Sequence, residues 1–83
     1  ARMRVTVRLF ARLRDIAGSG DLSREAPPGA TVADVWRGLV VEFPEMGRYD
    51  SSISSAVNAD YAKMSAGLSD GDEVAFLPPV SGG

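Results

Sequence analysis

The chain begins with a strict alternation of apolar and polar residues. Over residues 3–10, one face carries Met3, Val5, Val7 and Leu9, and the other carries Arg4, Thr6, Arg8 and Phe10. A period of two that includes β-branched residues is typical of a strand with one buried face. We predict a strand over residues 3–10 and a long loop over residues 11–20, since the latter segment closes on Gly18, Ser19 and Gly20.

A weaker strand is expected over residues 22–26, pairing back on the first strand. Pro27, Pro28 and Gly29 follow it and interrupt any ladder. The strongest helical signal comes next, where apolar residues recur at steps of three and four: Val32, Val35, Trp36, Leu39, Val40 and Phe43. Thr31 suits the N-cap because its hydroxyl can accept a hydrogen bond from the backbone near Asp34. A helix of about twelve residues, ended by Pro44, should cover one face of a sheet.

The second half of the chain predicts shorter elements. Residues 45–55 are polar and contain glycine, so we expect a loop there. Residues 56–61 indicate a short strand, a turn and another short strand, with Asn58 and Asp60 as turn residues. A tight turn over residues 68–72 then precedes a last strand over residues 73–77.

This order of elements predicts an α+β domain of β-grasp type. A right-handed crossover through one helix would lay the last strand parallel to the first, in the middle of a mixed sheet. One main helix would then cover one face of that sheet. We assign residues 1–77 to the domain and residues 78–83 to a projecting tail.

The tail carries the clearest chemical signal. Pro78 and Pro79 cannot donate ladder hydrogen bonds, so they end the strand and stiffen the exit from it. Gly82 and Gly83 have no side chains and can enter a narrow cleft. The α-carboxylate of Gly83 is therefore the predicted working group, and the competing interpretation is a flexible end or an expression remnant.

Composition removes several other functions. The 83 residues include no cysteine and no histidine, which excludes disulfides, a thiol nucleophile and a histidine base. A net charge of −2 argues against a nucleic-acid partner, and no apolar run suits a membrane span, so we expect a soluble cytoplasmic protein. Asp70, Asp72 and Glu73 lack the other ligands of a calcium loop, so a solvated turn without metal is expected.

Three segments resemble one known family, the small subunits of molybdopterin synthase. They are GDEVAFLPPVSGG at residues 71–83, VRLFARLRD at residues 7–15 and AVN at residues 56–58. The resemblance spans the full length, is most specific in the tail and is loose between residues 18 and 55. It implies a ubiquitin-like β-grasp fold that carries sulfur as a thiocarboxylate on the terminal glycine.

The resemblance also implies a set of partners. An adenylating, E1-like activating enzyme would use ATP to convert the carboxylate of Gly83 to an acyl-adenylate, and a sulfur donor protein would displace AMP. The large catalytic subunit of molybdopterin synthase would supply the catalytic groups and take the sulfur to the pterin precursor. The chain itself would bind no cofactor and would be the non-catalytic subunit of a sulfurtransferase.

Further site residues follow from these expectations. Gly83 would be the covalent site, and the tail that enters a partner comprises Pro78, Pro79, Val80, Ser81 and Gly82. The expected partner interface comprises Phe10, Leu77, Arg8 and Arg12. The alternatives are that Leu13 or Ile16 covers the two apolar residues and that the arginines form a solvated strand face.

Three other functions stay open at this point. A sulfur carrier for thiamine thiazole synthesis or another thiolation pathway would use the same Gly-Gly chemistry. A ubiquitin-like modifier would instead be joined to lysines of other proteins. A structural interaction module would need neither Gly82 nor Gly83.

Overall fold

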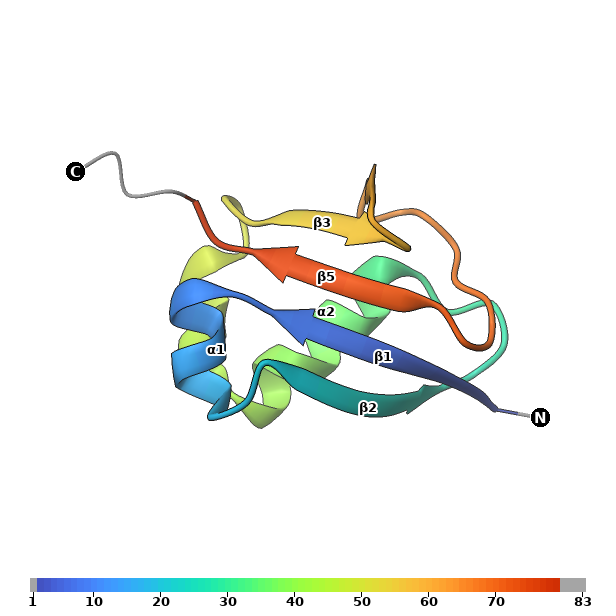
Figure 1. The fold of residues 1–83 in the computed structure, drawn as a ribbon, viewed down its shortest axis with the longest axis horizontal. Helices are drawn as coiled ribbons and strands as arrows, with labels where there is room; N and C mark the ends of the chain where they lie inside the picture. Colours follow the sequence, from blue (N-terminus) through green and yellow to red (C-terminus); the bar gives the residue numbers. More distant parts are fainter. Residues whose placement is uncertain (1, 80–83) are drawn as a thin grey trace.

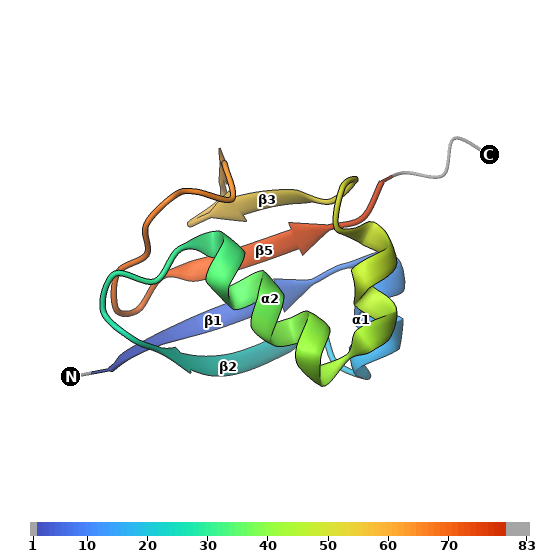
Figure 2. The same ribbon diagram turned by 180° about the vertical axis from the view of Figure 1, so that it is seen from behind.

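The computed structural model describes residues 2–79 as two layers, a sheet with its longest helix across one face (Figures 1 and 2). Its elements are β1 Met3–Leu9, α1 Ala11–Ala17, β2 Asp21–Ala26, α2 Val32–Glu42, the 3-10 helix η1 Pro44–Tyr49, β3 Ser54–Val57, β4 Asp60–Ala62 and β5 Glu73–Leu77. The strands lie in the order β2-β1-β5-β3-β4, so β5 is the central strand.

The pairing around β5 confirms the predicted crossover. β5 is parallel to β1, with Val7 opposite Val74, and antiparallel to β3, with Val57 opposite Val74. β1 and β2 form an antiparallel pair. The sheet is therefore mixed, with α2 packed across one face, as Figure 2 shows, and the α+β, β-grasp prediction is confirmed.

The core lies between the sheet and α2. The predicted inward residues of the first strand are all buried: Met3, Val5, Val7 and Leu9. Val74 and Phe76 point inward from β5, and the Phe76 ring centroid lies 5.1 Å from that of Trp36 on α2. The indole Nε1 of Trp36 donates a hydrogen bond to Asp50 Oδ1 at 2.7 Å, so the polar atom of this buried side chain is paired.

The start of α2 is fixed by a reciprocal cap, as expected. The Thr31 hydroxyl accepts a hydrogen bond from Asp34 N–H at 3.3 Å, and Asp34 Oδ2 accepts one from Thr31 N–H at 2.9 Å. The backbone hydrogen bond from Thr31 and the Arg37 guanidinium lower the pKa of Asp34. The carboxylate therefore stays ionised at the positive end of the helix dipole.

Two segments expected to be loops are helical, and those predictions are wrong. Residues 11–17 form α1, and Leu13 is completely buried in the core. Residues 44–49 form η1, with Pro44 at its first turn and Met46 completely buried. In both cases burial of one apolar side chain stabilises a helix too short for a periodic signal.

The β3–β4 hairpin is shifted from its predicted position. β3 begins at Ser54, and Asn58 and Ala59 form the turn with φ values of 51° and 75°. Asp60, expected in the turn, is the first residue of β4. Asn58 tolerates the left-handed region better than most residues, which is why the turn settles there.

The turn before β5 is held by Asp72. Its Oδ1 accepts a hydrogen bond from Asn58 Nδ2 at 3.0 Å, and its Oδ2 accepts one from Ser69 N–H at 2.8 Å. Gly71 beside it adopts a φ of 87°, a region that favours glycine. The hydrogen bonds from Asn58 and then Ser69 lower the pKa of Asp72 from its ordinary value of 3.8.

This lowered pKa predicts a pH-dependent contribution to folding. A carboxylate with a lowered folded pKa stabilises the native state above its unfolded pKa, and the contribution is lost as pH falls through the folded value. We expect Asp72→Asn to lower the free energy of unfolding at pH 7, with the difference from wild type shrinking below pH 3.8. Urea unfolding at a series of pH values measures this.

The matched control is Asp60→Asn, which changes the charge equally at an exposed carboxylate. A constant difference between Asp72→Asn and wild type at all pH values would show that ionisation of Asp72 does not stabilise the fold.

Candidate functional site

The sheet face opposite α2 divides into a charged half and an apolar half. The register aligns Arg8 of β1, Ala75 of β5, Ala56 of β3 and Tyr61 of β4 in one row across the sheet. The β1 end of this row is charged, and the rest is alanine and tyrosine. The β5–β3–β4 half therefore presents a flat surface of small apolar side chains with Tyr61 at its margin, 86% exposed.

Phe10 and Leu77 lie between two shallow hollows on this surface. Both hollows include these two side chains. The hollow beside the start of the tail is also lined by Ala11, Arg12, Tyr49, Pro78 and Pro79. The other is also lined by Ala56, Ala59, Tyr61 and Ala75. The predicted interface residues Phe10, Leu77 and Arg12 are thus neighbours in space, although they come from both ends of the chain.

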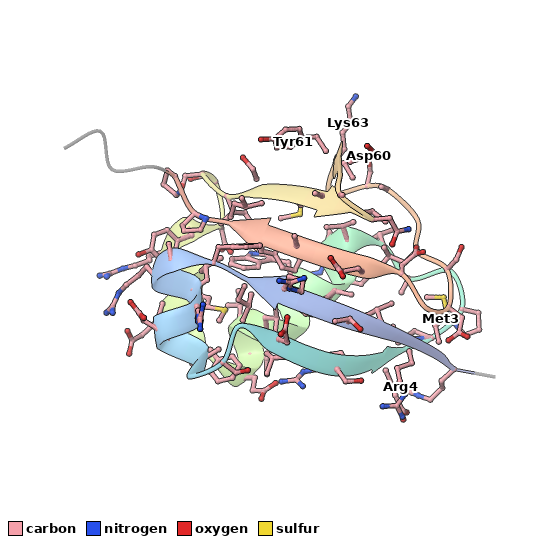
Figure 3. The ribbon with its side chains drawn as sticks, viewed as in Figure 1. Met3, Arg4, Asp60, Tyr61 and Lys63 are labelled. Atoms are coloured by element: carbon pink, nitrogen blue, oxygen red, sulfur yellow. The ribbon has the colours of Figure 1, made fainter. Side chains whose placement is uncertain are left out.

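Phe10 remains 40% exposed and Leu77 is half-buried. Leu13, which could have covered them, is instead fully buried in the core, and Ile16 is half-buried against that core. Neither Leu13 nor Ile16 lines the two hollows, and the role of Phe10 and Leu77 in docking stays a prediction. Figure 3 shows Tyr61 projecting away from the sheet at its margin, in agreement with its exposed side chain.

The arginines on this face have carboxylate neighbours. Arg8 Nε lies 2.6 Å from Asp21 Oδ1, and Arg8 Nη1 lies 3.5 Å from Glu73 Oε1. Arg12 Nη2 lies 3.9 Å from Glu45 Oε2. These pairs are largely exposed and contribute little to stability. They neutralise much of the positive charge, so the apolar half is the stronger docking feature, and a role of Arg8 and Arg12 in docking stays a prediction.

The tail leaves the domain at this site. β5 ends at Leu77, and Pro78 and Pro79 line the first hollow without continuing the strand, as expected. Val80, Ser81, Gly82 and Gly83 lie outside the described residues, so their roles stay predictions. Figure 1 shows the end of β5 beside α1, at the end of the sheet where β1 also finishes.

Sequence reasoning missed several residues that line the hollows: Ala11, Tyr49, Ala56, Ala59, Tyr61 and Ala75. Ala75 could have been found, because it alternates with Val74 and Phe76 and must face the opposite side of β5. Tyr49 could not, since it reaches the first hollow only through the short helix η1.

The sequence model described as the ThiS family matches residues 7–83. The chain belongs to the ThiS family. Among residues 2–79 of this ThiS family protein, no helix combines the length and apolarity that a bilayer crossing requires.

Two kinds of named protein are among the relatives of this ThiS family protein. The molybdopterin synthase sulfur carrier subunit of Arabidopsis thaliana is 38% identical over 79 residues, covering 95% of this chain and 82% of the relative. Small archaeal modifier protein 1 of Haloferax volcanii is 33% identical over 84 residues, covering 92% of this chain and 97% of the relative. The chain is thus similar both to sulfur carriers and to a protein named as a modifier.

Solved structures agree with the fold. The crystal structure of SAMP1 from Haloferax volcanii superposes with a TM-score of 0.85 at 33% identity, covering 96% of this chain and 99% of that one. A chain of the BexX/CysO complex from Amycolatopsis orientalis superposes with a TM-score of 0.70 at 29% identity, covering 95% and 99%. The protein is a sulfur-carrier-type, ubiquitin-like β-grasp domain.

Proposed function

We propose that this protein carries sulfur on the C-terminal carboxyl of Gly83 and donates it in molybdopterin synthesis. The observation that carries the proposal is the position of β5. This central strand ends at Leu77 between two open apolar hollows, and the sequence continues as PPVSGG from that point. The similarity to the Arabidopsis molybdopterin synthase sulfur carrier subunit favours the pathway.

Loading of the carboxyl proceeds in two steps, both on partner proteins. The carboxylate attacks the α-phosphate of ATP in an activating enzyme, which releases pyrophosphate and forms the acyl-adenylate. Sulfide-level sulfur from a donor then attacks the acyl carbon, so that the C–S bond forms as the bond to AMP breaks. The chain supplies the acyl group and no acid or base, which agrees with its lack of histidine and cysteine.

The geometry of the tail suits this division of labour. Six residues follow β5, and fully extended they would reach about 20 Å. The central position of β5 gives the tail a rigid base, because β5 is paired on both sides. Pro78 and Pro79 restrict the backbone at the exit, which lowers the entropy lost when the tail enters a cleft.

The apolar half of the open sheet face is the proposed contact with the large catalytic subunit. Phe10 and Leu77 lie where the two hollows meet, and aromatic and aliphatic residues of this kind dominate the buried part of protein interfaces. The activating enzyme would use the same end of the domain at a different time, since both partners need the tail.

A second candidate function is covalent attachment to proteins, favoured by the 33% identity to small archaeal modifier protein 1. A lysine amine would displace AMP from the same acyl-adenylate and form an isopeptide bond. The two functions share Gly83 and the activating step, so they separate only at the final acceptor.

The experiment that tests the proposal is intact-mass spectrometry. The protein is incubated with ATP, an activating enzyme of this family and a sulfur source. The expected product gains the mass of one sulfur minus one oxygen, and it then supports molybdopterin formation when a large subunit and the pterin precursor are added. Isopeptide adducts without any thiocarboxylate would favour the modifier, and an unchanged mass in an active system would contradict both functions.

A further inference from the structure

One long edge of the sheet, formed by β2, has no neighbouring strand among residues 2–79 (Figure 1). This edge is six residues long, whereas the opposite edge strand, β4, has three residues. An open strand edge offers unpaired backbone groups to any other strand, and proteins commonly block such edges. The side chains around β2 show how this one is blocked.

The ladder with β1 identifies which backbone groups of β2 point outward. Leu9 N–H donates to Gly20 C=O at 2.9 Å, next to the first residue of β2. Hydrogen-bonded residues alternate along an antiparallel ladder, so the even-numbered residues of β2 face β1. The backbone groups of Asp21, Ser23 and Glu25 therefore face outward.

Two side chains form hydrogen bonds with some of these outward-facing backbone groups. The Ser19 hydroxyl accepts from Asp21 N–H at 3.2 Å and donates to Asp21 C=O at 2.8 Å. Arg24 Nη1 donates to Ser23 C=O at 2.8 Å, and Arg24 Nη2 binds both carboxylate oxygens of Glu42 at 2.7 and 2.9 Å. The guanidinium of Arg24 thus spans from the strand edge to α2, where Glu42 holds it.

Charge also opposes the pairing of β2 with β2 of a second copy. In the two-fold antiparallel register that places Ser23 opposite Ser23, Asp21 faces Glu25. In the next register, where Ser23 faces Glu25, Arg24 faces Arg24. Like charges directly opposite each other destabilise a strand pair. Removal of Arg24 abolishes the repulsion between the two arginines in the second register, and it also frees the Ser23 carbonyl to accept a hydrogen bond.

We propose that Arg24 closes the β2 edge against pairing with a second copy of this chain, and that Glu42 positions it. The edge is a latent self-association surface. Ser19 and the acidic residues of β2 oppose pairing in part, and Arg24 completes the block. This role is independent of the tail, because β2 contributes no residue to the two hollows around Phe10 and Leu77.

The test is the association state of Arg24→Ala over a concentration series. We expect its apparent mass in sedimentation velocity to double relative to wild type as concentration rises. Hydrogen exchange at the Ser23 and Glu25 amides should slow in the dimer, because these outward groups become bonded. The matched control is Arg37→Ala, which removes the same charge from an arginine that binds Asp34 of its own helix at 2.8 Å and not the β2 backbone. This control should stay monomeric.

A second variant guards against a folding defect. Glu42→Gln leaves Arg24 in place but removes its charged anchor, and weaker association through the same amides is expected. Trp36 fluorescence reports whether each variant is folded. The proposal is overturned if folded Arg24→Ala stays monomeric with wild-type exchange at Ser23 and Glu25, or if Arg37→Ala associates equally. If Arg24→Ala does not fold, a monomeric Glu42→Gln overturns it.

Discussion

A chain that ends at Ser81 is expected to lose sulfur loading completely while keeping its folding stability. Removal of Gly82 and Gly83 moves the carboxylate two residues, about 7 Å, closer to the domain and places a side chain beside it. The acyl group could then no longer reach the reacting atoms of the activating enzyme in the same pose. A displacement of even 1 Å at a reacting centre can cost about a hundredfold in rate. Intact-mass spectrometry after incubation with ATP, activating enzyme and sulfur source measures the loss.

The control for this truncation is Ser81→Ala with the Gly-Gly end intact, which should load normally. Urea unfolding of both variants should match wild type, because the described core is built from residues between Met3 and Phe76. A thiocarboxylate on the truncated chain would contradict the proposed site. If that chain also supported normal molybdopterin formation, the proposed role of the Gly-Gly end in sulfur transfer would be contradicted too.

The parts of the fold that the sequence predicted correctly each rest on a repeated signal. β1 alternates over seven residues and α2 repeats its apolar stripe over three turns, so a single exception cannot hide either pattern. The order of these elements then places β5 beside β1 through the handedness of the crossover. The position of Leu77 on the open face follows directly, because it must face away from buried Phe76.

The elements that were not predicted depend on contacts that exist only in the folded domain. α1 has no N-cap hydrogen bond and starts at Ala11 with a φ of 52°, so no local rule announces it. Its stability comes from Leu13, whose burial depends on the whole sheet. The pairing of Arg24 with Glu42 at the β2 edge could not be predicted from the sequence either, since the two side chains meet only after α2 packs on the sheet. The hollow beside the start of the tail was missed for the same reason, because Ala11 and Tyr49 line it from α1 and η1.

Phe76→Ala is expected to be the most destabilising single truncation, at about 3–5 kcal/mol. Phe76 is completely buried on the central strand and packs against the Trp36 ring at 5.1 Å. Its loss leaves a cavity between β5 and α2 that two hydrogen-bonded neighbouring strands cannot easily close. Urea unfolding followed by Trp36 fluorescence measures the change in free energy. A cost below about 1 kcal/mol would mean that the core repacks around the missing ring.

The adjacent residue provides the control, because Leu77 points to the opposite face of the same strand. Leu77→Ala should cost only about 1 kcal/mol in stability, since its side chain is half-buried. It should instead weaken binding to the large catalytic subunit, as measured by titration calorimetry, because the proposed interface loses a central apolar contact. A large stability loss for Phe76→Ala, a small one for Leu77→Ala, and a binding loss for Leu77→Ala would separate the core of this carrier from its docking face. Equal binding by Leu77→Ala and wild type would place the partner on another surface.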